Sequence, residues 1–340
     1  MAATLMAQEM AEQPAVLARL IDRFESDVAR VRALRPAQLA GVVLVARGSS
    51  DHAAVFGRYL VESAAGRPTS LAAPSLHTLY HAHIDYNGYL AIALSQSGAT
   101  PEIITVCERM RATGARIIAI TNNADSPLAS VADVVLTLEA GEERAVPATK
   151  TVTSQFLAVA TVAAGLGSVP FTTTDLAALP GHVSTVLADD TAPRLLAQRW
   201  AGMDRLFVVA RGLLYGAALE TALKIKEATG VLAEGFSAAD LRHGPVAAID
   251  ANVAALILDG GGAASGDLAD LRDVLRRRNG PIALCAASEN ADLPLPMHVP
   301  EALAAILATV RGQQLALALA AVLGRNPDAP AGLSKVTPTH

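Results

Sequence analysis

Short apolar runs alternate with longer, helix-length segments along most of the chain. Four runs, each followed by polar residues or glycine, lie at 42–46, 89–94, 116–120 and 133–138. Runs of this length that are rich in Val, Ile, Leu and Ala predict buried strands. Strands that alternate with helices favour a parallel sheet with helices on both faces, which places the chain in the α/β class.

The first part of the chain has a different pattern. Within the stretch 4–35, apolar residues from Leu5 to Phe24 recur at mostly helical spacing, with Gln and Glu between them. We expect two helices in this stretch, separated near Pro14, because proline interrupts the backbone hydrogen bonding of a helix.

A second series of apolar runs begins at residue 205. The segment 205–230 aligns without a gap with 41–66, and both segments contain VARG and end in glycine. Two further runs follow, at 254–259 and 282–286. Self-similarity on this scale predicts an internal duplication, and therefore two similar α/β domains.

These patterns predict the organisation of the whole chain. We expect the last helix at about 300–323, followed by a tail rich in Pro and Gly that is either an ordered extension or a loose end. The expected parts are an N-terminal helical extension (1–35), a first α/β domain (36–170), a linking helix (171–198), a second α/β domain (199–325) and the tail (326–340).

Composition limits the class of protein further. Apolar residues make up 52% of the chain and charged residues 17%, which excludes a disordered chain. The net charge of −5 and the 4% aromatic content argue against nucleic-acid binding. The two cysteines, Cys107 and Cys285, lie in apolar segments, so we expect neither a disulfide framework nor a thiolate metal site.

The sequence does not predict a membrane protein. Its most apolar stretch is interrupted by Arg311, Gln313 and Gln314, and neither half reaches the roughly 20 residues that a membrane span needs. The amino-terminal residues include Glu9 and Glu12 and no basic leader. We therefore expect a soluble, cytoplasmic protein.

The segment LSQSGATPE (94–102) has the composition of a phosphate loop. It stands where a predicted strand passes into a predicted helix, with Thr100 at the N-cap and Pro101 at the first helical position. Hydroxyl and amide donors at the positive end of a helix dipole can hold a phosphate dianion. Ordinary capping and turn chemistry is the alternative. The polar residues at this turn and at the corresponding turn after the first strand are Ser95, Gln96, Ser97 and Thr100, with Ser49 and Ser50.

A charged face is predicted on the helix at 216–229. Glu220, Lys224 and Glu227 fall at i, i+4 and i+7, so they share one side of the helix. A solvated ion pair would explain the first two without any function. Because the neighbouring residues are apolar, the alternative is a cleft in which a carboxylate can carry a proton.

The segment SAADLRHGP (237–245) predicts a short helix. Ser237 and Asp240 have the spacing of a capping box, and Gly244-Pro245 ends the helix. His243 at its end is either a plain C-terminal histidine or a functional group. The remaining histidines show no spacing typical of a metal site, and neither a dinucleotide fingerprint nor a Walker loop is present, so no metal and no nucleotide cofactor is expected.

Five segments follow one another in a characteristic order. They are ARGSSD at 46–51, LSQSGATPE at 94–102, EERAVPATKTVTSQ at 142–155, the stretch 218–250, and LSKVT at 333–337. In this order they resemble the sugar isomerase (SIS) superfamily, and within it the isomerase part of glutamine-dependent glucosamine-6-phosphate synthase. The resemblance implies two tandem SIS domains, each a parallel sheet flanked by helices, with the tail ordered over the active site.

The resemblance also implies roles for individual residues. Glu227 would move a proton between C1 and C2 of the sugar, and His243, donated by the neighbouring subunit of a homodimer, would assist ring opening. Lys224 and Lys335 would contact the sugar hydroxyls or the open-chain carbonyl. The residues implied to bind the substrate are Ser49, Ser50, Ser95, Gln96, Ser97, Thr100, Val146 through its backbone, Glu234 and Ser334.

One departure from the synthase bears on the expected reaction. The synthase begins with a glutaminase domain, whereas this sequence reaches SIS-like segments within about 35 residues. The chain therefore resembles the SIS-type glucosamine-6-phosphate deaminases, to which TLMAQEMAEQP near its start is also similar. The implied reaction converts glucosamine 6-phosphate to fructose 6-phosphate and ammonia without a cofactor. Galactosamine-6-phosphate deaminase, fructosamine-6-phosphate deglycase, plain aldose-ketose isomerase and a sugar-phosphate sensor remain as alternatives.

Overall fold

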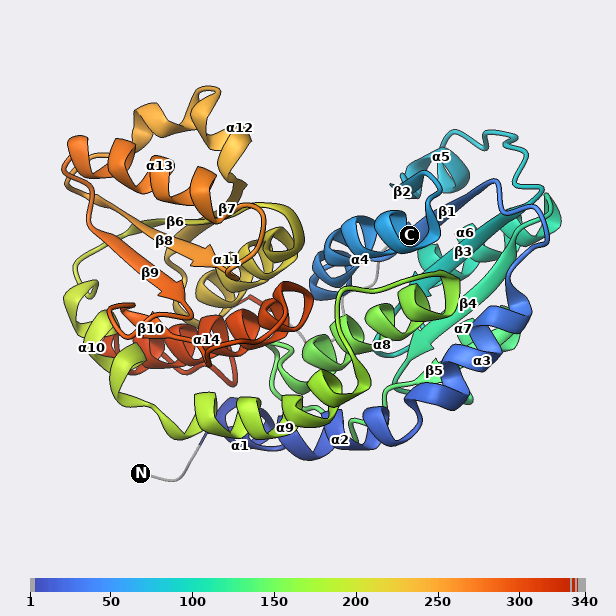
Figure 1. The fold of residues 1–340 in the computed structure, drawn as a ribbon, viewed down its shortest axis with the longest axis horizontal. Coiled ribbons are helices and arrows are strands. Elements are labelled where there is room, and N and C mark those ends of the chain that lie inside the picture. The colour runs from blue at the N-terminus through green and yellow to red at the C-terminus, as the bar shows by residue number, and fades with distance from the viewer. Residues whose placement is uncertain (1–3, 331, 334, 336–340) are drawn as a thin grey trace. The chain divides into compact units, whose positions relative to one another are not determined.

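The computed structural model describes residues 4–330, 332–333 and 335. Two five-stranded sheets contain its strands, and all pairings within them are parallel (Figure 1). The chain divides into two compact units. We call residues 16–142 and 151–169 the first-sheet unit, and residues 1–15, 143–150 and 170–335 the second-sheet unit.

The first sheet confirms the four predicted strands. It also contains β2, which was not predicted because it has three residues of which only Leu71 is strongly apolar. β1 is buried along its whole length, as expected of a strand covered on both faces. The strands are β1 (Gly41–Val45), β2 (Thr69–Leu71), β3 (Tyr89–Leu94), β4 (Arg116–Thr121) and β5 (Val134–Thr137), in the order β2-β1-β3-β4-β5.

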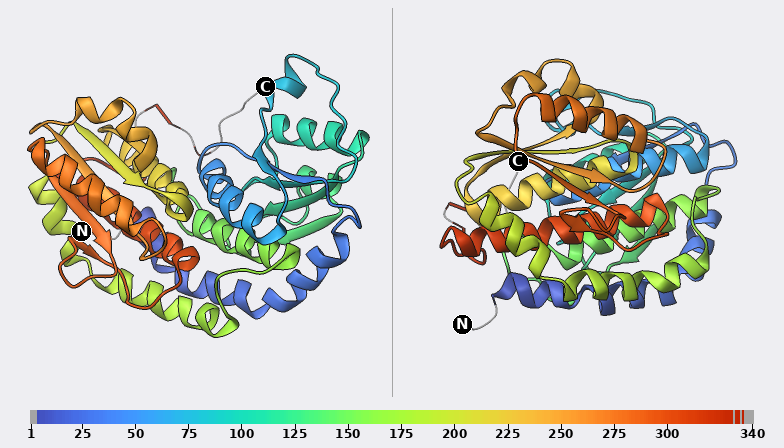
Figure 2. Two further views of the ribbon diagram at one scale, coloured as in Figure 1. Left: turned by 45° about the horizontal axis from the view of Figure 1, so that its top comes forward. Right: turned by 60° about the vertical axis from the view of Figure 1, so that its left-hand side comes forward.

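Helices cover both faces of the first sheet (Figure 2). On one face, α6 (Pro101–Ala112) and α7 (Pro127–Val131) pack against alternate residues of β1, β3 and β4. On the other face lie α4 (Ser49–Ala65) and α8 (Lys150–Leu166). The short α5 (Ser75–Thr78) follows β2.

Close packing of α4 and α8 depends on a glycine. A Cβ at Gly57 would lie 2.7 Å from Val159 Cγ1 and 3.0 Å from Leu44 Cδ2, so a larger residue would push the helices apart. Beside this contact, the rings of Phe56 and Phe156 stack with their centroids 4.9 Å apart.

The amino-terminal stretch forms three helices, so the expectation of two was wrong. They are α1 (Leu5–Ala11), α2 (Gln13–Asp22) and α3 (Phe24–Leu34). The first break lies at Glu12, because Pro14 is tolerated in the first turn of α2, where a backbone donor is not needed. The second break lies at Arg23, whose guanidinium bonds Thr137 at the end of β5 and Glu139 two residues further on.

The second sheet repeats the topology of the first. Its order is β10-β9-β8-β6-β7, which is the order of the first sheet with β6 in the place of β1. This agreement confirms the internal duplication. The strands are β6 (Arg205–Ala210), β7 (Leu232–Ser237), β8 (Val253–Asp259), β9 (Ile282–Ala286) and β10 (Leu293–Pro294), of which β7 and β10 were not predicted.

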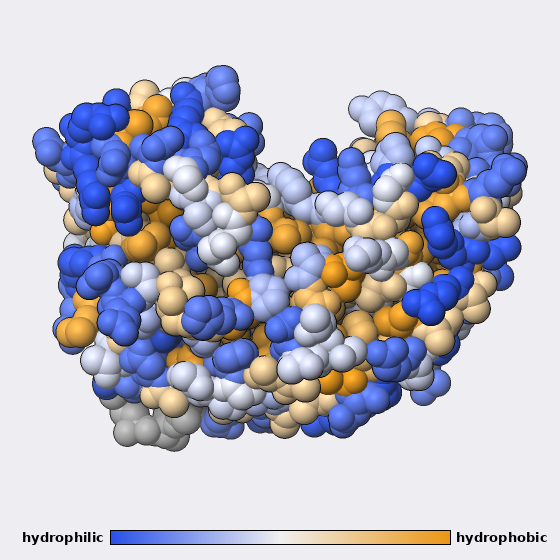
Figure 3. Space-filling view, in the orientation of Figure 1, coloured by the Kyte–Doolittle hydropathy of each residue, from blue (hydrophilic) through white to orange (hydrophobic). Residues whose placement is uncertain are grey.

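Helices also sandwich the second sheet. α12 (Ala238–Arg242) and α13 (Ser265–Arg277) pack on one face, and the surface over α13 is hydrophilic (Figure 3). α11 (Tyr215–Thr229) and α14 (Glu301–Val322) lie on the other face. The 3-10 turns η1 (Gly212–Leu214) and η2 (Pro245–Ala248) precede α11 and follow α12.

The predicted linking helix consists of two helices, α9 (Thr173–Ala188) and α10 (Thr191–Arg199). Arg311 of α14 stabilises the break between them, because its guanidinium bonds both the backbone carbonyl and the carboxylate of Asp189 at 2.9 Å. The arginine that interrupts the apolar run in the sequence is thus buried and binds a helix end.

α14 is the one described helix long and apolar enough to cross a membrane by length and composition. Its most apolar window is 83% buried, as in the core helix of a folded domain. The thiols of Cys107 and Cys285 are buried as well, and burial raises the pKa of each to about 12. Both are unreactive core residues.

Candidate active site

The strand order of the first sheet places its topological switch point between β1 and β3. β2 lies beyond β1 and β4 beyond β3, so the turns after β1 and β3 lead away from each other. In open α/β sheets, ligands bind at the carboxyl ends of the strands at such a point. The turn 48–50 and the loop 95–100 are these two turns.

Gly98 shapes the loop after β3. Its φ of +63° is in the left-handed region, and a Cβ there would lie 2.1 Å from Ser126 Oγ. Only glycine fits both conditions. The backbone N–H of Gly98 bonds the Ser95 carbonyl at 3.1 Å and the Ser95 hydroxyl at 3.2 Å, which closes the turn.

The hydroxyl groups of this loop are oriented by the backbone. Ser95 Oγ and Ser97 Oγ accept hydrogen bonds from the N–H groups of Gly98 and Ala99 at 3.2 Å, so their hydroxyl hydrogens point away from those amides. Thr100 is the N-cap residue of α6 as predicted, but its hydroxyl makes no capping bond and lies 3.3 Å from Ser95 Oγ. Capping therefore does not account for the Thr100 hydroxyl, whereas the Ser95 and Ser97 hydroxyls do make turn contacts with the backbone. Gln96, Ser97 and Thr100 are half-buried and can reach a ligand.

The turn after β1 contributes a second oriented hydroxyl. Gln155 Nε2 donates to Ser50 Oγ at 3.0 Å, so the hydrogen of the Ser50 hydroxyl is left for another acceptor. Gln155 is fully buried on α8 and was not singled out from the sequence, although it lies in the segment EERAVPATKTVTSQ. Gly48 caps α4 without a side chain, and Ser49 is the first residue of that helix.

An ion pair joins the two turns. Arg47 at the end of β1 bonds the Glu102 carboxylate in the first turn of α6 through two nitrogens, at 2.9 and 3.1 Å. Glu102 is buried, so this two-point contact holds the starts of α4 and α6 together. Burial also raises the pKa of Asp51, although His52 and Arg47 oppose the shift.

In the second-sheet unit, the three charged residues of α11 are in contact, as their spacing predicts. Lys224 Nζ lies 2.5 Å from Glu227 Oε2 and 3.3 Å from Glu220 Oε1. The side chains of Lys224 and Glu220 are fully buried, whereas that of Glu227 is 18% exposed. The alternative of a solvated ion pair is therefore wrong.

Burial and charge oppose each other at Lys224. Burial lowers its pKa, but the carboxylates of Glu220 and Glu227 outweigh this and raise it above the ordinary value. Lys224 is thus held as an ammonium ion. It fixes the carboxylate of Glu227, which is the member of the cluster that solvent reaches.

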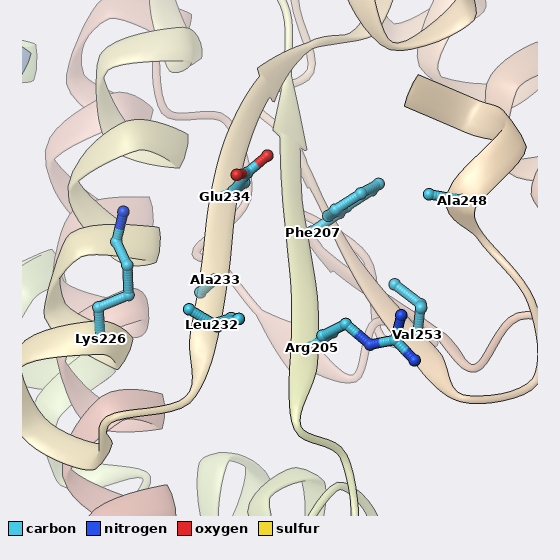
Figure 4. A pocket seen from close by; sticks show the side chains of 8 residues that line it. All are labelled: Arg205, Phe207, Lys226, Leu232, Ala233, Glu234, Ala248 and Val253. Carbon is cyan, nitrogen blue, oxygen red and sulfur yellow. The ribbon is translucent and has the colours of Figure 1, made fainter. Parts of the chain in front are cut away.

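Glu234 and His243 lie elsewhere in the same unit. Glu234 on β7 lines a cleft of about 400 Å³ beside Phe207, with Lys226 projecting from α11 (Figure 4). His243 is exposed at the C-cap of α12. Ser237 is the N-cap of this helix but makes no side-chain capping bond, so the predicted capping box was wrong. Within the described ranges, His243 makes no side-chain hydrogen bond with Glu227 or Lys224.

Lys335 contacts the segment that contains Val146. Its ammonium lies 2.9 Å from Glu143 Oε2 and 2.8 Å from the Ala145 carbonyl. The side chain of Glu143 is fully buried, and it was not predicted as a site residue. Ser334 lies outside the described residues. Among the described residues, no group of three His, Cys, Asp or Glu side chains could hold a metal ion.

A model of the SIS domain matches this chain twice, at residues 38–164 and 201–323. The chain belongs to the SIS domain family. The first SIS match contains the serine and threonine turns, and the second contains Lys224, Glu227, Glu234 and His243. Lys335 lies beyond the second match, and the loop at 143–149 lies in the first.

Curated relatives of this SIS protein are glutamine–fructose-6-phosphate aminotransferases (isomerizing). The protein from Gloeobacter violaceus is 32% identical over 97% of this chain and 58% of its own length. That from Symbiobacterium thermophilum is 35% identical over 68% of this chain and 38% of its own length. The chain thus spans about two fifths to three fifths of these relatives.

Solved structures show the same SIS fold. A proposed phosphosugar isomerase from Silicibacter pomeroyi is 30% identical, covers 96% of this chain and 100% of its own, and has a TM-score of 0.83. The glucosamine-6-phosphate deaminase from Thermotoga maritima has a TM-score of 0.79 over 99% of this chain and 100% of its own. At 22% identity, the latter likeness concerns the fold alone.

Proposed function

We propose that this protein is a phosphosugar isomerase that deaminates a hexosamine 6-phosphate, with glucosamine 6-phosphate as the substrate and fructose 6-phosphate and ammonia as products. The observation that carries the proposal is the carboxylate of Glu227, fixed by a buried ammonium yet open to solvent. A pure binding module needs no such group. The isomerizing relatives support the same class of chemistry.

The phosphate is held by the two turns of the first sheet. Ser50, Ser97 and one of the hydrogen-bonded pair Ser95 and Thr100 donate hydroxyl hydrogens to the phosphate. The first-turn amides of α4 and α6 add the positive ends of two helix dipoles. Gln96 adds an amide, and Ser49 stands beside Ser50. All of these donors are uncharged hydroxyl or amide groups. We expect them to bind the phosphate dianion throughout the isomerisation of the sugar.

The reaction begins with ring opening, assisted by His243. Glu227 then takes the proton from C2 of the open-chain 2-amino aldehyde, and the electron pair moves to form an enolamine as the aldehyde oxygen gains a proton. Glu227 returns its proton to C1, and the nitrogen gives up one proton, which balances the proton that the aldehyde oxygen gained. The result is a 2-imino ketose. Water adds to the imine and ammonia leaves, so fructose 6-phosphate and ammonia balance the substrate and one water.

The two lysines have different places in this scheme. Lys224 acts on Glu227, whose oxygen it holds at 2.5 Å, and its ordered charge keeps that carboxylate in one orientation. Lys335 is tied to the segment that contains Val146, and the backbone of Val146 closes the sugar site. The cytoplasmic location and the support of the site by Glu234 remain predictions.

A substrate panel tests the reaction. Ammonia release and ketose formation are measured with glucosamine 6-phosphate, galactosamine 6-phosphate, a fructosyl-amino-acid 6-phosphate and an aldose 6-phosphate. Ammonia and fructose 6-phosphate in equal amounts from glucosamine 6-phosphate would support the proposal. Turnover of only the galacto epimer or of the fructosamine would assign the corresponding alternative, and binding without turnover would assign a sensor.

The active site is proposed to be shared within a homodimer, with His243 donated to the partner subunit. Glu227→Gln and His243→Ala subunits, each inactive alone, are mixed and the heterodimer is purified. One intact site per heterodimer would restore about half of the wild-type activity, since two sites are present in the parent. A dimeric but inactive heterodimer would show that each site uses one chain only.

A further inference from the structure

The loop at 143–149 has no regular secondary structure, so its amides need acceptors from elsewhere. Glu9 of α1 supplies them. Its Oε1 lies 2.5 Å from the Arg144 nitrogen, and both of its oxygens lie 3.3 Å from the Ala145 nitrogen. Glu9 is 5% exposed, and no role for it follows from the chemistry above.

Ala145 is held from its other side by the tail. Its N–H donates to Glu9, and its carbonyl accepts from Lys335 Nζ at 2.8 Å. Lys335 also bonds Glu143, whose other oxygen accepts the Thr149 N–H at 3.0 Å. One residue of the loop therefore connects the amino-terminal helix with the carboxyl-terminal tail.

A second contact joins the same two ends. Asp328 accepts the backbone N–H groups of Leu5 and Met6 at 2.7 and 2.9 Å, so its carboxylate binds the amino-terminal end of α1. The tail thus contacts α1 directly at its start and, through Ala145, at Glu9. Burial raises the pKa of Glu9, and the Arg144 amide opposes this shift. A buried carboxylate lowers the stability of the fold unless hydrogen bonds compensate for its lost hydration, and the amides of Arg144 and Ala145 supply such bonds.

We propose that Glu9 is a positioning residue that fixes the Ala145 peptide so that its carbonyl receives Lys335. Through this contact, α1 orders residues 326–330 and 335 of the tail and the loop that contains Val146. This goes beyond the proposed function, which assigns nothing to α1. The effect of Glu9 on turnover rests on the proposed function, whereas its effect on the loop and the tail does not. The carboxylate acts through the loop and touches no reacting atom.

Hydrogen exchange tests the contact without reference to activity. Glu9→Ala should speed exchange of the Arg144 and Ala145 amides by about ten-fold or more, and should also speed exchange in the tail segment 326–333. Glu12→Ala is the matched control. It removes a carboxylate three residues away that bonds Lys150 at 2.7 Å, but it leaves the amides of the loop untouched.

The link to turnover is tested by a double-mutant cycle. Glu9→Ala should lower kcat/KM about 10- to 100-fold, because a displaced positioning group costs this much. Glu9→Gln keeps an acceptor oxygen and should retain most of the activity. Adding Glu9→Ala to Lys335→Met should have little further effect, since both act through Ala145, whereas Glu12→Ala and Lys335→Met should combine additively.

Each outcome decides the proposal. Unchanged exchange of the Arg144 and Ala145 amides in folded Glu9→Ala overturns the contact, and unchanged tail exchange overturns the ordering of the tail. Faster exchange with unchanged kcat/KM overturns the link to turnover. If the wild-type protein releases no ammonia from any substrate on the panel, the proposed function fails, while the exchange results still decide the role of Glu9. If Glu9→Ala does not fold, Glu9→Leu, which also removes both acceptor oxygens but fills more of the buried space, replaces it in the exchange experiment and in the cycle with Lys335→Met.

Discussion

The two repeats have the same strand order, but the proposed phosphate donors of the first repeat and the proposed base of the second lie at opposite ends of their sheets. In the first repeat they gather at the carboxyl ends of β1 and β3. In the second repeat Glu227 lies in the last turn of α11, which runs back to the amino end of the sheet before β7 begins. In the proposed function, the first repeat therefore binds the phosphate and the second repeat supplies the base.

The switch point of the second sheet lies between β6 and β8. It differs from that of the first sheet because the carboxylate of Glu301 lies beside the turn after β8. After β8 the chain continues as GGGAAS, whose single hydroxyl, that of Ser265, donates to Asp259 at 2.6 Å, in place of the three hydroxyls of the first repeat. A Cβ at Gly262 would lie 1.8 Å from Glu301 Oε2, and the backbone of Ala263 donates to the same carboxylate. The carboxylate of Glu301 thus stands at a turn equivalent to the phosphate loop, which makes a second phosphate there unfavourable.

The helices that follow the first strand of each repeat, α4 and α11, also differ, and here it is the second repeat that contains the charged residues. In the gapless alignment, Glu220, Lys224 and Glu227 of α11 correspond to Phe56, Leu60 and Ser63 of α4. Phe56 and Leu60 are buried core residues. The buried position is thus common to both helices, and only the second repeat fills it with a charged cluster.

The largest expected effect is on α11. Glu227→Gln keeps the shape of the side chain but removes the base, so kcat for ammonia release should fall by roughly 10² to 10⁴. Fructose 6-phosphate binding, measured by calorimetry, should stay within several-fold. Ser63→Ala at the corresponding position of α4 is the control and should leave kcat unchanged. Near-normal ammonia release by Glu227→Gln would show that Glu227 is not the base.

A smaller effect is expected at the phosphate loop. Ser97→Ala combined with Thr100→Ala removes two donors to a charged group, so KM should rise by about 10- to 100-fold with a smaller change in kcat. Ser265→Ala, which removes a hydroxyl at the corresponding turn of the second repeat, serves as the control in the same steady-state assay. An equal rise in KM for the double variant and for Ser265→Ala would contradict the proposal that only the first repeat binds the phosphate.

Two glycine substitutions sharpen the same comparison. Gly98→Ala introduces strain at a positive φ and a clash with Ser126, so we expect a loss of about 1 to 3 kcal/mol in the free energy of unfolding and a higher KM. Gly262→Ala meets the end of the Glu301 side chain, which can move, so its cost should be lower and KM should not change. Urea denaturation and kinetics measure both. A larger loss at Gly262 would contradict this account.

The smallest effect concerns the pH dependence of Glu301. Burial raises its pKa, and Asp259 adds to the shift, although the Ala263 backbone opposes it. The native state therefore takes up a proton at a higher pH than the unfolded chain does, and the charged carboxylate costs stability at neutral pH. Glu301→Gln should be more stable than the wild type at pH 7.5, by a margin that shrinks as the pH falls to 4.5. Exposed Glu289→Gln is the control, and a margin that grows on acidification would contradict the assignment.

Much of the fold could be predicted because buried strands leave a local signal. The runs at 89–94 and 282–286 are continuous and apolar, and the structure has strands with the same bounds. β2 and β7 were missed because they are edge strands with mixed composition, such as LAEGFS, and take their conformation from a neighbour. The break between α9 and α10 depends on Arg311, more than a hundred residues away in sequence, which no local pattern reveals.

The candidate site was predictable where its residues are close in sequence. The spacing on α11 predicted the contact of Lys224 with Glu220 and Glu227, and the loop 95–100 contains most of its own hydrogen bonds. The contacts of Ser50 with Gln155, of Lys335 with Glu143, and of Glu9 with Ala145 each join residues that are distant in the chain. Such contacts follow from the tertiary fold and could not be assigned from one sequence.

The burial of α14 has a consequence for how the protein is synthesised. α11 packs along α14, and the contact is so close that a Cβ at Gly312 would lie 2.0 Å from Thr221 Oγ1. A ribosome completes α14 some seventy to ninety residues after α11. During that interval the nascent chain has α11 without its partner, so the ion pairs of Lys224 remain hydrated. The buried setting of Lys224 and Glu227, on which the proposed proton transfer relies, therefore depends on one of the last helices to be translated.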